Sequence, residues 1–558
     1  MLPENSFLSL MLLAGLWLLL PLIPVNKLAS RAMVLVPMIP VQIIYLHWRY
    51  MDTLEIFEFS APVLWQYIFF VTEILVIVYT TWQCLTLIRF TDRTKQCDSL
   101  IISNRRQPER SVDLFIPTYS ESRAILSETI AAAKTDNYRS LTIWICDDGN
   151  RDWLRKLCKA EKVRYLSRPA SEPLRTKAAN LHWCIPYGSG EYVVCLDADF
   201  KLKPEFITRI TSFLQEPETG LVQAPQHFRN LDPVQRNLLG GTAWTEEQRF
   251  FFDIGLPSRD AWDNALCVGS CWACKRQIID DLGGFPTDSI VEDVYFGYRV
   301  KSCGYKTVYL NECLATGLAA EDTPSYVGQR KRWCLGAINL LFDSNGPLRS
   351  KGLKLIDRVF YLELPFYWFT HIHLLLLLLA PAIYGYLGYN VFNCTTEELF
   401  TILIPKNILI CTAFYWVSSG RCMPIVTPVQ RMISLFHTLP AICQGLITPK
   451  IVKFTVTKKD IKHSGRTFHW RIATPFIIIG IMTVLATLKT FSQNYSEFYW
   501  SDYVAYNALL TAYSLITVFL CCLVCVDKPL PKSNKKSNIP LTGNWLRTSV
   551  VLSRRIFH

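Results

Sequence analysis

The chain has 558 residues, of which 50% are hydrophobic, and its mean hydropathy is +0.19. These values are high for a purely soluble protein, and the length suffices for two or three domains, so we expect a membrane-embedded part. The formal net charge of +12 could indicate a nucleic-acid partner. In a membrane protein, however, Lys and Arg collect in cytoplasmic loops, and we therefore expect no nucleic acid to bind.

Seven apolar blocks are too long for buried core helices, and crossing a bilayer requires about 20 apolar residues. They are residues 7–25, 32–47, 61–89, 365–388, 399–418, 472–490 and 503–526. Basic residues follow the first and third blocks, whereas acidic residues follow the second. Because Lys and Arg favour the cytoplasmic side, we predict a multi-pass protein of the plasma (inner) membrane. Its N-terminus is expected outside, and its central segment and C-terminus are expected in the cytoplasm.

Between residues 92 and 358 the pattern changes to short apolar runs and amphipathic stretches, which is typical of an α/β domain with a largely parallel sheet. The best predicted strands are Val112–Pro117, Leu141–Cys146 and Tyr192–Leu196. The 19 cysteines show no disulfide-type spacing, and we expect them to be reduced. The predicted domains are 1–91 with three membrane helices, 92–358 as a cytoplasmic α/β domain, 359–526 with four membrane helices, and 527–558 as a short basic tail.

A polar cluster follows each of the three strands: residues 117–121, residues 147–149 and the triplet Asp197-Ala198-Asp199. Ligands of open α/β sheets bind beyond the carboxyl ends of the strands. Carboxylate oxygens suit Mg²⁺ or Mn²⁺, so the Asp-x-Asp pair predicts a divalent cation site, although Asp is also common in solvated turns. Arg175 and Lys177 lie between the acidic clusters and can pair with phosphate, which favours a nucleotide-diphosphate site.

Two later motifs also carry polar groups suited to catalysis. Glu292-Asp293 precedes a helical stretch, and residues 329–333, Gln-Arg-Lys-Arg-Trp, lie shortly before the chain returns to the membrane. Arg332 can neutralise a leaving diphosphate, and Trp333 offers a flat apolar face for a sugar ring. The alternative interpretation of the second motif is an anchor of Trp and Arg at the membrane interface.

In this order, Asp148, Asp197-x-Asp199, Glu292-Asp293 and Gln329-x-x-Arg332-Trp333 resemble the D, DxD, TED and Q(Q/R)xRW signature of the family 2 processive glycosyltransferases. The resemblance is greatest to the cellulose synthase branch, and it includes residues 176–180, 222–225, 230–237 and, at 454–459, the FxVTxK gating loop. Two positions depart from the family pattern. Val291 replaces the Thr of TED, and Val268 replaces the Cys of the acceptor-site motif FFCGS.

The resemblance implies an α/β domain of the GT-A type, in which UDP-glucose is polymerised into a β-1,4-glucan that passes through the membrane helices. It implies the following site residues. Thr118, Glu121, Asp148, Lys177, Asp197 and Arg332 would bind UDP; Asp197 and Asp199 would hold Mg²⁺ or Mn²⁺; Asp293, with Glu292, would be catalytic; Gln329, Arg332 and Trp333 would bind the acceptor; and Phe454, Val456, Thr457 and Lys459 would form the gating loop within 450–470, beside an interfacial helix.

Three alternatives stay open at this point. A β-1,3-glucan synthase of the curdlan type shares these motifs, an enzyme that adds one sugar to a lipid carrier shares part of them, and a polysaccharide exporter without catalysis would also need many membrane spans. Residues 527–558 are too few to fold the cyclic-di-GMP-binding PilZ domain of the cellulose enzymes, so we expect no cyclic-di-GMP to bind this chain. The expected partners are the UDP-sugar donor, the glucan acceptor and the lipid bilayer; a periplasmic or accessory subunit is left open.

Overall fold

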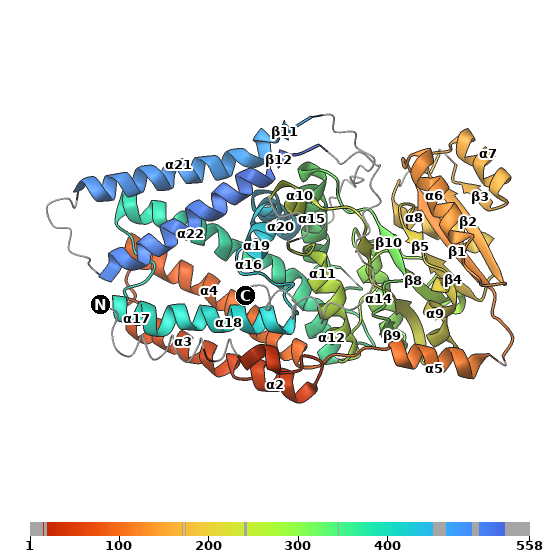
Figure 1. Cartoon of the computed structure of the whole chain (residues 1–558), viewed down its shortest axis with the longest axis horizontal. Coiled ribbons are helices and arrows are strands. Elements are labelled where there is room, and N and C mark those ends of the chain that lie inside the picture. Colours follow the sequence, from red (N-terminus) through yellow and green to blue (C-terminus); the bar gives the residue numbers. More distant parts are fainter. Residues whose placement is uncertain are drawn as a thin grey trace, which may run out of the picture.

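The computed structural model describes residues 15, 19–105, 107–169, 171–172, 175–238, 243–343, 345–449, 465–493 and 502–529. Most of the first predicted span, residues 7–25, lies outside this set, and so do all four predicted gating-loop residues, Phe454, Val456, Thr457 and Lys459. The described chain forms an elongated molecule, with long helices at one end and a sheet covered by helices at the other (Figure 1).

The predicted α/β domain is confirmed. Its seven-stranded sheet has the order β3-β2-β1-β4-β8-β6-β9. These strands are β1 Val112–Thr118, β2 Leu141–Asp147, β3 Arg164–Ser167, β4 Tyr192–Cys195, β6 Thr219–Gln223, β8 Trp272–Lys275 and β9 Lys306–Tyr309. All neighbours are parallel except β8, which runs antiparallel to both β4 and β6. A second sheet has three short strands, β5 Lys201–Leu202, β10 Ala315–Gly317 and β7 His227–Phe228.

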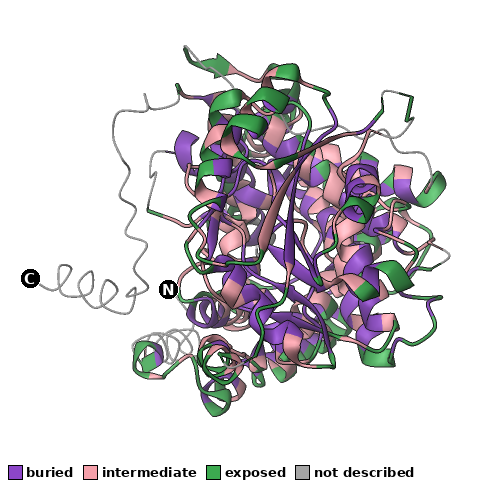
Figure 2. Cartoon of the chain, turned by 90° about the vertical axis from the view of Figure 1, so that its right-hand side faces the viewer, coloured by how far each residue is buried: buried purple, intermediate pink, exposed green. Residues whose placement is uncertain are grey.

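The central strands are buried on both faces, as parallel strands with covering helices require. On β1, Leu114 and Ile116 pack in one apolar core, whereas Phe115 packs in the core on the opposite face. The surrounding helices are α5 Thr94–Asn104, α6 Arg123–Ala133, α7 Asp152–Glu161, α8 Lys177–Cys184, α9 Phe206–Thr211, α13 Arg276–Asp281 and α14 Glu292–Ser302. Figure 2 looks onto this end of the molecule and shows buried strands enclosed by helices with exposed outer faces.

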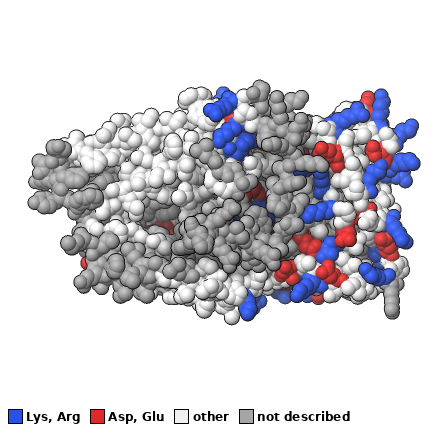
Figure 3. Space-filling model, viewed as in Figure 1, with Lys and Arg blue, Asp and Glu red and all other residues white. Residues whose placement is uncertain are grey.

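Six helices in the described part of the chain are long and apolar enough to cross a membrane: Leu28–Asp52, Ala61–Ile88, Leu355–Leu387, Thr396–Val417, Trp470–Ser492 and Ala505–Val524. They contain α2 Leu28–Leu35, α3 Met38–Asp52, α4 Ala61–Ile88, α16 Leu355–Leu387, α17 Thr396–Glu398, α18 Ile404–Val417, α21 Trp470–Gln493 and α22 Asp502–Val524. On the face seen in Figure 3, charged side chains gather over the α/β domain, and the described surface of these helices is mostly uncharged. Each helix matches one of the last six predicted spans, but α16 begins ten residues before its predicted span.

Short helices and buried ion pairs join the two parts. The joining helices are α10 Pro233–Asn237, α11 Gln248–Phe250, α12 Leu256–Asp260, α15 Thr323–Asn339, α19 Val426–Met432 and α20 Leu435–Ile447. Arg259 of α12 lies 2.7 Å from Glu363 of the membrane helix α16, and both side chains are largely buried. The indole nitrogen of Trp262, which follows α12, donates to the carbonyl oxygen of Thr86 on α4 at 3.0 Å. The α/β domain is thus anchored on two membrane helices.

Close packing between α16 and α21 provides a test of the membrane part. A methyl group added at Gly385 of α16 would lie 2.7 Å from the backbone oxygen of Ala486 on α21. Because a helix backbone cannot move locally, we expect Gly385→Ala to lower the stability by about 1–3 kcal/mol. At Gly480 of α21 the added methyl would meet only a methyl of Val518, at 3.1 Å, so Gly480→Ala is the matched control. Thermal unfolding in detergent measures both, and equal losses would contradict the importance of the backbone contact.

Candidate functional site

The site begins at the carboxyl ends of β1, β2 and β4, which are neighbours in the sheet. Thr118, the last residue of β1, pairs in register with Asp147, the last residue of β2. The amide of Asp148 donates to the carbonyl oxygen of Thr118 at 2.9 Å. The Asp197-x-Asp199 segment follows β4 on the other side of β1. The structure therefore brings the three predicted polar clusters to one edge of the sheet.

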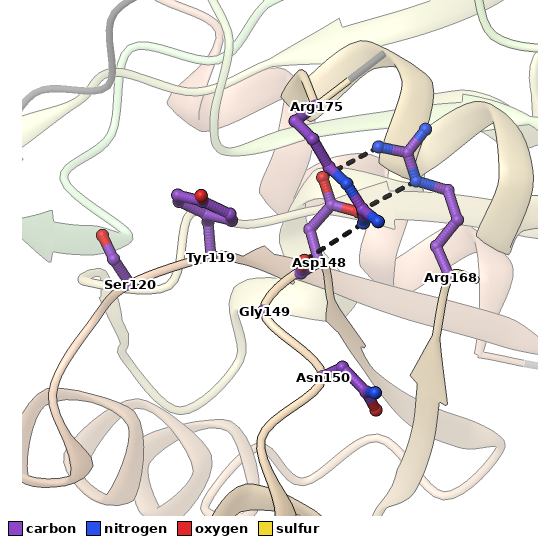
Figure 4. A pocket seen from close by; sticks show the side chains of 7 residues that line it. All are labelled: Tyr119, Ser120, Asp148, Gly149, Asn150, Arg168 and Arg175. Atoms are coloured by element: carbon purple, nitrogen blue, oxygen red, sulfur yellow. Dashed lines mark hydrogen bonds and ion pairs between the residues drawn. The ribbon is translucent and has the colours of Figure 1, made fainter. Parts of the chain in front are cut away.

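Asp148 lies in a cavity of about 440 Å³ (Figure 4). Its carboxylate accepts two hydrogen bonds from Arg168, both at 2.9 Å, and lies 2.8 Å from the guanidinium of Arg175. Arg175, which the sequence analysis selected as able to pair with phosphate, forms an ion pair with Asp148 in the structure. The cavity is lined by Tyr119, Ser120, Asp148, Gly149, Asn150, Arg168 and Arg175. It is a concave site with positive charge at its wall.

Thr118 and Glu121 shape the turn after β1, beside this cavity. The hydroxyl of Thr118 and the amide of Tyr119 both donate to one oxygen of Glu121, at 2.5 and 2.8 Å. Arg151 donates to the Thr118 hydroxyl at 2.8 Å and forms an ion pair with Asp147. The two predicted UDP-binding residues are therefore in contact, and Arg151, which the sequence analysis did not select, holds them.

Lys177 contacts the third cluster. It is the first residue of α8, and the preceding Thr176 caps this helix by accepting from the amide of Ala179 at 3.2 Å. The Lys177 ammonium lies 2.5 Å from a carboxylate oxygen of Asp197 and also donates to the carbonyl oxygen of Gly269. Burial alone would lower the pKa of Lys177, but the negative charges around it, of which that of Asp197 is the largest, raise the pKa above its ordinary value.

The residues present fit a divalent cation that is shared with an anionic ligand. The Asp197 side chain is one-third exposed, and buried Asp199 accepts a hydrogen bond from the amide of Leu318 at 3.0 Å. Two carboxylates are fewer ligands than the roughly six that Mg²⁺ takes, and diphosphate oxygens and water suit the other positions. Within the described residues no group of three or more His, Cys, Asp or Glu side chains could hold a metal.

Glu292 and Asp293 begin α14 and lie close enough to Lys177 to interact with its charge. One oxygen of Asp293 accepts from the amide of Val294 at 2.8 Å. Burial raises the pKa of both carboxyls, and the positive charges of Lys177 and Arg332 oppose this shift. Lys177 and Arg332 therefore both act electrostatically on the Glu292–Asp293 pair, one from the sheet edge and one from α15.

The loop 268–270 lies between Lys177 and Asp293. Gly269 has a φ of +93°, and a Cβ built there would lie 2.9 Å from an oxygen of Asp293, so both its backbone conformation and its surroundings require glycine. Gln223 accepts from the amide of Val268 at 2.9 Å, and Gln226 donates to the Val268 carbonyl oxygen. Sequence analysis did not assign a role to these glutamines or to Gly269. No local sequence signal shows the positive φ of Gly269 or its contact with Asp293.

The third part of the site is α15, which carries Gln329, Arg332 and Trp333, all half-buried. Trp333 packs in an apolar cluster with residues of α16 and α20, which argues against the alternative of an anchor in the lipid interface. Val291 contacts Gly336 of the same helix so closely that a Cβ at Gly336 would overlap it. This contact places the Glu292–Asp293 pair next to α15.

Two family models match the chain. The model for glycosyl transferase family 2 matches residues 113–283, and the model for cellulose synthase matches residues 258–415. The chain contains a family 2 glycosyltransferase domain. The second match continues from α12 into α18, so it links this glycosyltransferase domain to the membrane helices.

Curated relatives agree with this assignment. The chain is 28% identical over 422 residues to the UDP-forming cellulose synthase catalytic subunit of Pseudomonas fluorescens, covering 74% of this chain and 56% of that protein. It is 27% identical over 448 residues to the cellulose synthase 1 catalytic subunit of Komagataeibacter xylinus, covering 80% and 59%. The chain thus spans somewhat more than half the length of these relatives. Among solved structures, a mannosyltransferase from Pyrobaculum calidifontis in complex with GDP-Man and Mn²⁺ is 15% identical, covers 74% of this chain and 99% of its own, and has a TM-score of 0.43.

The contact between Gly269 and Asp293 can be tested by adding one methyl group. We expect Gly269→Ala to displace the Asp293 carboxylate and to lower sugar transfer by roughly a hundredfold, because a shift of about 1 Å can cost that much in rate. Gly304→Ala is the matched control, since Gly304 has a similar φ of +89° but no neighbour within 4 Å of the added methyl. Both variants bear the cost of the positive φ, about 1–2 kcal/mol in thermal unfolding. Full transfer activity in Gly269→Ala would disprove the contact.

Proposed function

We propose that the protein is a processive, inverting glycosyltransferase that polymerises UDP-glucose into a β-1,4-glucan and moves this polymer across the membrane. The observation that carries the proposal is the convergence of Lys177, at the sheet edge that also carries Asp148, and Arg332 of α15 on the Glu292–Asp293 pair. The Asp148 cavity can hold a nucleotide, and α15 packs against the membrane helices α16 and α20. The donor site, the acceptor site on α15 and the exit path between the membrane helices would therefore lie in this order along the molecule.

UDP would occupy the Asp148 cavity, with Thr118 and Glu121 at its wall and its diphosphate directed towards Lys177 and Arg332. Cationic side chains form strong charge-assisted hydrogen bonds to phosphate oxygens. Asp197 and Asp199 would hold Mg²⁺ or Mn²⁺ at the diphosphate, and the bound ion would neutralise part of the leaving group's charge. Lys177 already balances Asp197, so a donor that brings its own negative charge and a cation preserves the charge balance of the site.

Asp293 would act as the general base. The acceptor hydroxyl oxygen forms a bond to the anomeric carbon while the bond from that carbon to the diphosphate breaks. The hydroxyl proton passes to the Asp293 carboxylate, and the electron pair leaves with UDP, which inverts the anomeric configuration. Burial and the adjacent Asp293 raise the pKa of Glu292 above its ordinary value, which favours its neutral form and so lowers the repulsion beside the base.

The acceptor chain would end at Gln329, Arg332 and Trp333 and continue between the membrane helices. An aromatic ring such as that of Trp333 can stack on a pyranose, and the cluster that contains it leads to Trp368 of α16 and Ile442 of α20. The resemblance supports cytoplasmic transfer, with the N-terminus outside, in the plasma (inner) membrane. The acidic loop after α16 and the basic residues that follow α4 agree with this orientation.

The principal alternative is a β-1,3-glucan synthase, because the hydroxyl that faces Asp293 depends on how the terminal glucose lies on Trp333. The buried Asp293 carboxylate beside Lys177 and Arg332 disfavours an exporter without catalysis, because transport alone needs no general base. Glucan linkage and donor sugar are therefore the two features that experiment must assign.

The role of Asp293 predicts a separation of binding from catalysis. Asp293→Asn keeps the shape of the side chain but removes its basicity, so we expect transfer to fall by about 10²–10⁴-fold while UDP binds normally. Asp199→Asn should instead weaken metal-dependent UDP binding. Calorimetric UDP titration and a sugar-incorporation assay in the same membranes measure both effects. Near-normal synthesis by Asp293→Asn would show that another group is the base.

The donor and the linkage are tested with radiolabelled UDP-glucose and Mg²⁺ or Mn²⁺, followed by linkage-specific digestion. We expect an insoluble polymer that a β-1,4-glucanase releases and a β-1,3-glucanase does not, with chelation of the metal stopping synthesis. Release only by the β-1,3 enzyme would select the alternative linkage. Incorporation only from UDP-N-acetylglucosamine would exclude a glucan, and incorporation of a single sugar would exclude processivity.

A further inference from the structure

A cluster of hydrogen bonds lies at the end of α22, away from both the Asp148 cavity and the Glu292–Asp293 pair. At its centre is Asp527, whose side chain is completely buried. Asp527 belongs to β12, Val526–Asp527, which pairs with β11, Thr467–Phe468, just before α21. Figure 1 places both strands near α10 and α15, at the junction between the membrane helices and the glycosyltransferase domain. The sequence analysis had assigned this residue to a tail.

The Asp527 carboxylate contacts three separate segments of the chain. One oxygen accepts from Arg236 at 2.9 Å, from Asn237 at 2.8 Å and from the hydroxyl of Thr323 at 2.9 Å. The other accepts from the amide of Thr323 at 3.0 Å and lies 2.6 Å from Nε2 of His469. Arg236 and Asn237 belong to α10, and Thr323 is the first residue of α15. One carboxylate therefore joins α10, α15, α21 and the end of α22.

Neighbouring contacts reinforce the cluster. The carbonyl oxygen of Val524, at the end of α22, accepts from Asn237 at 2.8 Å and lies 2.9 Å from the Thr323 hydroxyl, which shares its single hydrogen between this oxygen and Asp527. Burial would raise the pKa of Asp527, but the hydrogen bonds from His469 and Asn237 outweigh it and lower the pKa to about 2. The carboxylate is thus ionised at neutral pH and balances the buried charge of Arg236.

The connection to α15 gives the cluster a functional consequence. The same helix carries Gln329, Arg332 and Trp333, and at a rise of 1.5 Å per residue Arg332 lies only about 13 Å along the axis from Thr323. Two of the Asp527 contacts, to the amide and to the hydroxyl of Thr323, hold the first turn of α15 against axial movement. An uninterrupted helix transmits such a constraint to its later turns.

We propose that Asp527 is a positioning residue for sugar transfer, which fixes the start of α15 to the end of α22 and thereby sets the distance from Trp333 and Arg332 to Asp293. This inference rests on the proposed function. Asp527 does not line the Asp148 cavity, so its loss leaves the nucleotide contacts of that cavity in place. It shifts Trp333 at the acceptor and Arg332 at the reacting phosphate, so the main loss is in the transfer rate. Asp527 thereby couples α15 to the end of the membrane helix α22.

The experiment compares Asp527→Asn, Thr323→Val and the wild-type protein in nanodiscs. We expect the transfer rate of Asp527→Asn to fall by roughly ten- to a hundredfold, with the KM for UDP-glucose within about twofold of the wild-type value. Thr323→Val removes one donor and leaves Arg236 paired, so it should fold even if Asp527→Asn does not, and its rate should fall in the same direction by less. Hydrogen exchange should become faster in residues 323–328 of both variants.

The matched control is Glu161→Gln, which removes an exposed ion pair with Lys134 and should change neither rate nor exchange in α15. An unchanged rate in both variants at the Asp527 cluster, or a KM that rises as much as the rate falls, would overturn the inference. If the wild-type protein makes no polymer from any UDP-sugar, the proposed function fails instead. The exchange of residues 323–328 then still reports whether Asp527 holds α15.

Discussion

Buried charges at the junction of the two domains constrain the rest of the molecule, because an unpaired buried charge costs several kcal/mol. Arg259 pairs with Glu363, and Arg236 pairs with Asp527. Arg421, which follows α18, lies 3.0 Å from Asp253. The partners are more than 100 residues apart in each pair. Apolar contacts alone could tolerate sliding between the domains, whereas these pairs specify one arrangement.

The same requirement for charge balance organises the candidate site. Asp148 is matched by Arg168 and Arg175, and Asp197 is matched by Lys177. The Glu292–Asp293 pair lies in the field of Lys177 and Arg332, so the donor side and the acceptor side act on the same two carboxyls. A ligand with two phosphates and a divalent cation could bind here if its phosphates pair with the Lys and Arg side chains and its cation pairs with the Asp carboxylates. These contacts would replace ion pairs such as that between Lys177 and Asp197.

The two departures from the family pattern have a physical interpretation in the structure. Val291, in place of Thr, makes an apolar contact with Gly336 of α15, for which no hydroxyl is needed. Val268, in place of Cys, is held through its backbone by Gln223 and Gln226, so the side chain at this position is not what fixes the loop. Both substitutions leave the carboxylates and cations of the site in place.

The sequence by itself determined the α/β domain, six described membrane helices and the order of the polar clusters, because alternation and long apolar runs are local signals. It also placed Asp148, Asp197 and Asp293 at strand or helix ends, where the topology brings them together. Only the tertiary structure decided what these groups contact. The pairing of Arg175 with Asp148, the fit of Gly269 against Asp293 and the burial of Asp527 depend on segments distant in the chain, and no local pattern specifies them.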